Sequence, residues 1–223
     1  MNNSIKNPFS ELFKYTSISL IFSLIGFIFG QMFIPPSLAK LGNMFLGLFF
    51  LITFIASFFL KKGNSLFWTI RKVYLYAFIN GICIYPVVNY YAYSLGLSTV
   101  MTVFFGTIIV FAGLSIYGKS KNSDNVLNFG PVLSMILLGI IIASFINLFL
   151  NSSIFNLGIS ALAIILFSIY IVYTVNGFKH QLRYSNFDCA NDYAPFVINL
   201  YTDFINLFLN ILKFLDAVNR NKD

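Results

Sequence analysis

The stretch "NLYTDFINLFLN", residues 199–210, places an aspartate inside a run of phenylalanine, leucine and isoleucine. Asp203 has no residue of opposite charge within nine positions on either side. A charged group away from water is costly unless it is paired or hydrogen-bonded. The rest of the fold must therefore supply surroundings in which this carboxyl group is tolerated.

Apolar runs of this kind recur along the chain of 223 residues, of which 58% are hydrophobic and 9% charged. Soluble domains carry about 25% charged residues, and about twenty apolar residues in a helix cross the ~30 Å hydrocarbon layer of a bilayer. The alternating pattern of a membrane β-barrel is absent from the sequence. We therefore predict an all-α membrane protein whose main partner is the lipid bilayer.

Charged residues, proline and glycine divide the chain into seven expected transmembrane helices within a single membrane domain, 1–223. The first run follows a polar segment, "MNNSIKNPFSELFKY", and lacks a small-residue cleavage site, so we expect a retained helix rather than a signal peptide. No internal repeat is evident. The expected spans are about 15–34, 41–60, 73–93, 97–117, 129–150, 154–177 and 193–215.

The basic residues are distributed unevenly between the two sides of this seven-span arrangement, which predicts a cytoplasmic amino terminus and an external carboxyl terminus. The basic residues near the carboxyl terminus oppose that assignment mildly. Ten lie on the side of the amino terminus: Lys6, Lys14, Lys61, Lys62, Arg71, Lys72, Lys119, Lys121, Lys179 and Arg183. Four lie on the other side: Lys40, Lys213, Arg220 and Lys222.

Asp203 belongs to a polar stripe on the last expected helix. At 100° per residue, four of its members fall within roughly 60° of one another. One interpretation is an ion or proton path along a central helix, which we favour for the aspartate. The other is a buried asparagine ladder that joins helices around a protonated aspartate, which we favour for the asparagines alone. The four residues are Asn199, Asp203, Asn206 and Asn210, and Asp192 and Lys213 extend the stripe.

Other classes of function lack support in the sequence. There is no HExxH, no GxSxG, no phosphate-binding loop and no pair of membrane carboxylates at catalytic spacing, so we expect no enzyme activity and no cofactor. Cys83 and Cys189 form no CxxC motif, and no disulfide is expected. The net charge of +7 is not organised as a stripe interleaved with aromatic residues, which argues against nucleic-acid binding.

The segment "INLYTDFINLFLNILKFL", 198–215, resembles the last helix of the Bax inhibitor-1 family, whose members end in a pattern like "LYLDFINLFLxLLRLL". Further pieces follow the family order: "GFIFGQ" at 26–31, "GICIYP" at 81–86, "FFGTIIVF" at 104–111 and "LFSIYIVYTVNGFKH" at 166–180. The resemblance covers nearly the whole chain. It implies six helices wrapped around a central C-terminal helix and, in bacterial members, a calcium leak that is controlled by pH.

The resemblance also implies how that control operates: two aspartates, in the sixth and seventh helices, share protons and close the pore when paired. Asp203 matches the aspartate of the seventh helix. Where the family reads "YD" in the sixth helix, this chain reads Tyr173 and Thr174. A threonine hydroxyl donates a hydrogen bond but does not titrate. Asp188 or Asp192 could substitute from the loop, although Asp192 lies about three turns from Asp203.

We therefore expect a calcium or other cation leak channel with a modified pH gate, in which Asp203 is the pore carboxylate. Asn199, Asn206 and Asn210 would add oxygen ligands of the kind that Ca²⁺ prefers. The alternative is a non-conducting partner that regulates a membrane protease or a stress response, and a substrate transporter ranks third because repeats are absent. Residue usage rich in Asn, Ile, Lys and Phe suggests a bacterial plasma membrane, and the pattern specifies no oligomeric state.

The predicted topology can be tested with reporter fusions. Fusions after residues 64 and 122 should report the cytoplasm and a fusion after residue 95 the external side, because Lys and Arg are concentrated in the former loops. The same reading from the fusions after residues 64 and 95 would contradict the seven-span arrangement.

Overall fold

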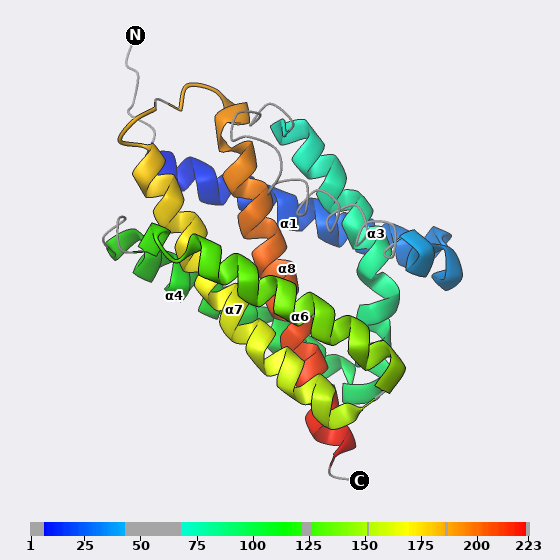
Figure 1. The fold of residues 1–223 in the computed structure, drawn as a ribbon. Coiled ribbons are helices and arrows are strands. Elements are labelled where there is room, and N and C mark those ends of the chain that lie inside the picture. The colour runs from blue at the N-terminus through cyan, green and yellow to red at the C-terminus, as the bar shows by residue number, and fades with distance from the viewer. Residues whose placement is uncertain (1–6, 43–67, 122–125, 151, 186, 222–223) are drawn as a thin grey trace. The chain divides into compact units, whose positions relative to one another are not determined.

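A computed structural model describes residues 7–42, 68–121, 126–150, 152–185 and 187–221. Regular structure in these residues is entirely helical. The helices whose bounds lie within the described residues are, in chain order, α1 (Pro8–Phe33), α3 (Ile70–Leu95), α4 (Leu97–Ser120), α6 (Gly130–Leu150), α7 (Ser153–Gln181), the short 3₁₀ helix η2 (Ala190–Tyr193) and α8 (Ala194–Arg220) (Figure 1).

Six helices among the described residues are long and apolar enough to cross a membrane: α1, α3, α4, α6, α7 and α8, the last together with η2. They coincide with six of the seven expected spans, which confirms the all-helical membrane fold. The remaining expected span, 41–60, falls almost wholly outside the described residues. The single domain stays a prediction.

Local sequence explains where several helices begin. The Asn7 side chain accepts a hydrogen bond from Phe9 N at 3.1 Å, and Pro8 occupies the first turn of α1. Ser152 caps α7 in the same manner through Phe155 N. Between α3 and α4 only Gly96 intervenes, with φ +88°, a conformation that glycine adopts without strain. The chain therefore passes from α3 into α4 over a single residue.

The described chain forms two compact units, and α3 and α8 contribute to both. Unit 1 contains the described residues up to Asn89 together with Phe187–Tyr201. Unit 2 contains those of Tyr90–Asn186 and Thr202–Asp223.

In unit 1, α1 and α3 run in the same direction and touch through their backbones. A Cβ atom at Gly26 would lie 2.0 Å from the carbonyl oxygen of Phe78, and one at Gly81 would lie 2.0 Å from the carbonyl oxygen of Ser23. Further along, a Cβ atom at Gly30 would meet Ile82. Glycine therefore permits a separation that any larger residue would prevent, as in other membrane helix pairs.

In unit 2, α7 packs against both α4 and α6, and the part of α8 that belongs to this unit packs against α4. The ring of Phe204 meets the rings of Phe104 and Phe111 at centroid distances of 6.0 and 5.6 Å, and Phe208 meets Phe104 at 5.7 Å. These edge-to-face contacts are the geometry that aromatic rings prefer.

The last helix is the most enclosed of the candidate spans. In the most apolar 18-residue stretch of this span, 56% of the residues are buried. The corresponding share in the other five candidate spans is 11–44%. This difference confirms the expected central position of the C-terminal helix.

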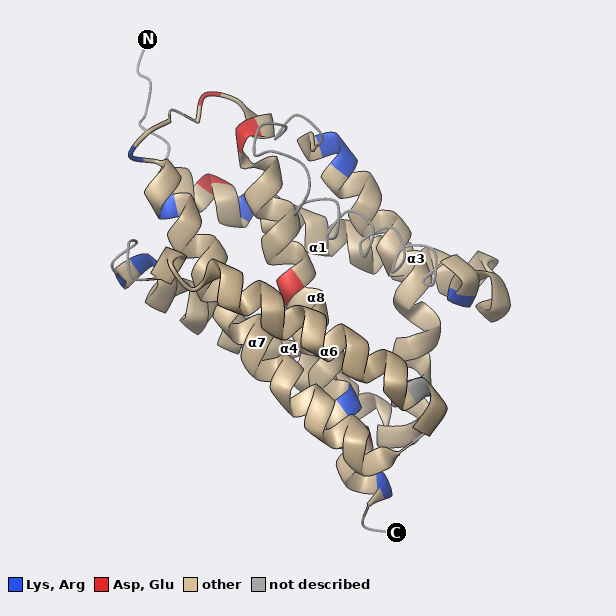
Figure 2. Ribbon diagram, viewed as in Figure 1, with Lys and Arg blue, Asp and Glu red and all other residues tan. Residues whose placement is uncertain are grey.

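The buried and exposed faces of α1 are arranged for lipid rather than water. Its buried residues are mostly small or polar, whereas large apolar residues face outward. A water-soluble helix would show the opposite arrangement, because water expels the apolar face. Figure 2 shows long stretches of helix without charge. The buried residues of α1 are Leu12, Thr16, Ser19, Ser23, Gly26 and Gly30, and the exposed ones include Ile21, Leu24, Ile25 and Ile28.

Contacts at the helix ends of unit 2 show which ends lie together. The Ser94 hydroxyl donates to Asp216, and the Ser153 hydroxyl donates to Asn221 Oδ1 at 2.6 Å. The end of α3, the beginning of α7 and the end of α8 therefore share one side of the unit. Asn176 in α7 donates from Nδ2 to the carbonyl oxygen of Gly118 in α4, so these two helices have their carboxyl ends on the other side. This alternation is the one that the seven-span topology requires.

We expect a reporter at the carboxyl terminus to give the same reading as a fusion after residue 95 and the opposite reading to a fusion after residue 122. Arg220 pairs with Asp216 at 3.1 Å, which offsets part of the positive charge that opposed this assignment. Agreement of the carboxyl terminus with the fusion after residue 122 would contradict the observed helix directions.

Candidate functional site

Asp203 lies within α8, away from both ends of the helix, and is only 7% exposed. The hydroxyl of Thr174 in α7 donates a hydrogen bond to Asp203 Oδ2 at 3.3 Å. Thr174 is itself buried. The structure therefore brings together the two positions that the sequence singled out as the matched aspartate and its replaced partner.

Aromatic side chains lie next to Asp203. Its neighbour Phe204 is fully buried and contacts the rings of Phe104 and Phe111 in α4. Among the described residues of unit 2, Thr174 is the hydrogen-bond partner of Asp203, and no ion pair includes this carboxyl group. An uncompensated negative charge is costly in such a place, so a proton or a cation at these oxygens would stabilise the carboxyl group.

The asparagines of the polar stripe differ from one another. Asn199 is exposed and belongs to unit 1, whereas Asn206 and Asn210 are partly buried in unit 2. Asn210 donates from Nδ2 to the backbone oxygen of Asn206 at 2.8 Å, a bond that runs along α8 rather than to another helix. The described contacts join none of these amides to Asp203. Their roles as ion ligands stay predictions.

Asp192 has a local structural role. Its Oδ2 accepts hydrogen bonds from the backbone nitrogens of Asp188 at 3.0 Å and Cys189 at 2.8 Å, which caps η2 before α8 begins. A carboxylate in this position satisfies backbone donors at the start of a helix. The described contacts therefore engage Asp192 in its own loop.

A buried polar network in unit 1 was not predicted. Tyr201 is fully buried, and its hydroxyl donates to Ser23 Oγ at 3.0 Å and accepts from Asn80 Nδ2 at 3.0 Å. The network joins α8 to α1 and α3. The sequence shows these three residues only as isolated polar positions within apolar runs. Nothing in it pairs them, because they are far apart along the chain.

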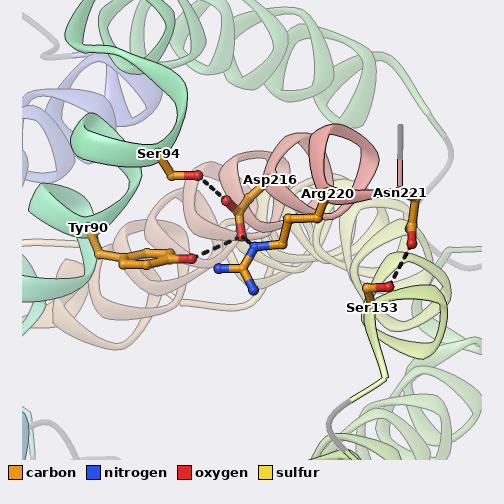
Figure 3. Close-up of polar contacts among 6 residues, drawn as sticks. All are labelled: Tyr90, Ser94, Ser153, Asp216, Arg220 and Asn221. Atoms are coloured by element: carbon orange, nitrogen blue, oxygen red, sulfur yellow. Dashed lines mark hydrogen bonds and ion pairs between the residues drawn. The ribbon is translucent and has the colours of Figure 1, made fainter. Parts of the chain in front are cut away.

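A second polar cluster, in unit 2, also escaped the sequence analysis (Figure 3). Asp216 is 8% exposed and pairs with Arg220 Nε at 3.1 Å. It accepts hydrogen bonds from the hydroxyls of Ser94 and Tyr90 in α3. Asp216 and Arg220 are one helical turn apart, a spacing that favours an ion pair. Nothing in the sequence indicated the partners in α3.

No group of three or more His, Cys, Asp or Glu side chains is placed to hold a metal ion among the described residues. A cation at Asp203 would therefore need most of its ligands from amide, hydroxyl or carbonyl oxygens or from water, all of which suit Ca²⁺.

These features define the class: an all-helical integral membrane protein with a buried carboxyl group on its central last helix. A family model described as "Inhibitor of apoptosis-promoting Bax1" matches residues 6–221, so the chain belongs to the Bax inhibitor-1 family. This match confirms the resemblance that was read from residues 198–215.

Individual relatives match the chain over different shares of its length. An uncharacterized protein of Helicobacter pylori strain J99 is 29% identical over 208 residues, which cover 91% of this chain and 83% of the relative. An uncharacterized protein of Campylobacter jejuni is 32% identical over 207 residues, with coverage of 85% and 86%. The mouse protein named "Protein lifeguard 4" is 36% identical over 121 residues, 54% of this chain and 48% of the relative.

Proposed function

We propose that this Bax inhibitor-1 family protein is a calcium or other cation leak in which Asp203 is the single pore carboxylate. The observation that carries the proposal is the burial of Asp203, on the most enclosed helix, with Thr174 as its hydrogen-bond partner. Ionisable residues within membrane spans are rare, face the protein interior and commonly mark ion or proton pathways. We expect no enzymatic step.

The proposed gate differs from the two-aspartate gate that the family resemblance implies. Two carboxyl groups held close together titrate as a coupled pair. At 3.3 Å from Asp203, the Thr174 hydroxyl can hold the carboxyl group in place but cannot share its proton equilibrium. We infer a single-step titration of Asp203 and a weaker dependence of flux on pH.

The alternative is a non-conducting membrane protein that regulates a membrane protease or a stress response. Thr174 favours this alternative, because it occupies the position of the missing titratable residue. Calcium flux through liposomes that contain the purified protein separates the two proposals, since a non-conducting protein would give no calcium flux.

The setting of the proposed activity is a bacterial plasma membrane, with the amino terminus in the cytoplasm. Similarity to bacterial proteins over most of their length and the uneven distribution of Lys and Arg support this location.

Asp203→Asn should lower calcium efflux from liposomes by about tenfold, which corresponds to about 1.4 kcal/mol on a barrier. The amide keeps the shape of the side chain and accepts the hydrogen bond from Thr174, so expression and thermal stability should change little. Glu11→Gln, the same chemical change at a carboxylate that pairs with Lys14 in the first turns of α1, is the matched control. Unchanged efflux from a stable Asp203→Asn protein would remove the carboxyl group from the ion path.

Thr174→Asp should make calcium efflux depend more steeply on pH between about pH 5 and pH 8, because it restores a second acid beside Asp203 and couples the two titrations. Thr174→Asn is the control, since it has the size of aspartate without its proton. The measurement is efflux from liposomes as a function of pH for the native protein and both variants. A native response as steep as that of Thr174→Asp would assign the second acid elsewhere, and Asp192 is the first residue to replace in that case.

A further inference from the structure

Asp216 is a second buried carboxyl group of α8 within unit 2, and neither the calcium pathway nor its gate uses it. Its side chain is 11% exposed, whereas the side chain of its ion-pair partner Arg220 is 57% exposed. The anion is therefore enclosed by protein, while the cation reaches it from the surface.

Two hydroxyls of α3 hold the carboxylate in place. Ser94 Oγ donates to Asp216 Oδ1, and Tyr90 Oη donates to Asp216 Oδ2 at 3.4 Å. Tyr90 and Ser94 are four residues apart, so they lie one above the other on the same face of α3. The carboxylate thus faces two donors in the last turns of α3.

Arg220 approaches the same carboxylate from one turn further along α8. Its Nε atom lies 3.1 Å from Asp216 Oδ2, and its guanidinium lies 5.7 Å from the centre of the Tyr90 ring. Arg220 therefore neutralises Asp216 and also covers the tyrosine that donates to it (Figure 3).

A neighbouring hydrogen bond extends this arrangement to a third helix. Ser153 in the first turn of α7 donates to Asn221 Oδ1 at 2.6 Å, immediately after Arg220. The end of α8 is consequently attached to the end of α3 and to the beginning of α7, all within unit 2.

We propose that Tyr90, Ser94, Asp216 and Arg220 form an ionic latch that holds the last turns of α8 against the end of α3. Asp216 is its fixed anion and Arg220 its tethered, replaceable cation. Removal of the carboxylate leaves two hydroxyls without their acceptor and the guanidinium without its counter-ion. The latch proposal concerns only the contact between α8 and α3, so it can be tested independently of the calcium leak.

The first test measures amide hydrogen exchange in residues 213–221 of the purified full-length protein. Asp216→Asn should increase exchange there by about tenfold, since bonds to a charged acceptor are the stronger ones. Asn219→Ala, at an exposed position of the same turn, is the matched control and should change little. If Asp216→Asn does not fold, the double variant Tyr90→Phe, Ser94→Ala removes both α3 donors and leaves the ion pair intact.

The second test uses chemical rescue. Arg220→Ala should raise exchange in residues 213–221, and dilute guanidinium chloride should restore protection, whereas the same concentration of sodium chloride should not. Restored protection requires that guanidinium bind at the Asp216 carboxylate in place of the Arg220 side chain. If Arg220 only favoured helix formation, added guanidinium would have no such effect.

Unchanged exchange in the folded carboxylate or hydroxyl variant would overturn the latch. Equal effects of guanidinium and sodium on Arg220→Ala would overturn the assignment of Arg220 as its replaceable cation. Faster exchange in α8 of the Asp216→Asn protein, together with normal calcium efflux, would support the latch and show that the ion path does not depend on it.

Discussion

Lipid offers no hydrogen bonds, and this constraint governs where polar side chains lie in the described helices. Hydroxyls in α1 and α4 bond back to their own helix: Thr16 to the carbonyl oxygen of Leu12, and Thr107 to that of Val103. Tyr201 bonds to neighbouring helices instead. Asp203 is unusual under the same constraint, because one long bond from Thr174 is its described compensation. This burial beside a single described hydrogen-bond donor is the observation on which the proposed ion path rests.

Much of the fold could be predicted, because apolar runs of bilayer length allow few alternatives to helices. The boundaries were less accurate where a charge interrupts a run without ending a helix. Charges led to an expected start of α1 near residue 15, but it starts at Pro8, since Glu11 and Lys14 pair along the helix at 3.1 Å. Likewise α8 continues past residue 215 to Arg220, where Asp216 and Arg220 pair. Ion pairs one turn apart let a helix carry charge beyond its apolar segment.

The candidate site was predictable to the extent that a motif places it. Matching the family pattern identified Asp203 and Thr174, and the structure joins them. Helical periodicity placed the asparagines on one face but could not tell what that face meets. The capping role of Asp192 depends on a short 3₁₀ turn, and the α3 partners of Asp216 lie more than a hundred residues away. Neither follows from local spacing.

The one-residue joint at Gly96 has a mechanical consequence. With so short a connection, a displacement of the last turn of α3 is passed directly to Leu97, since no flexible linker is present to absorb it. From there α4 carries Phe104 and Phe111 to the ring of Phe204, beside Asp203. A rearrangement of the residues that bind Asp216 would therefore displace the start of α4, the helix that carries the aromatic contacts beside the buried carboxyl group.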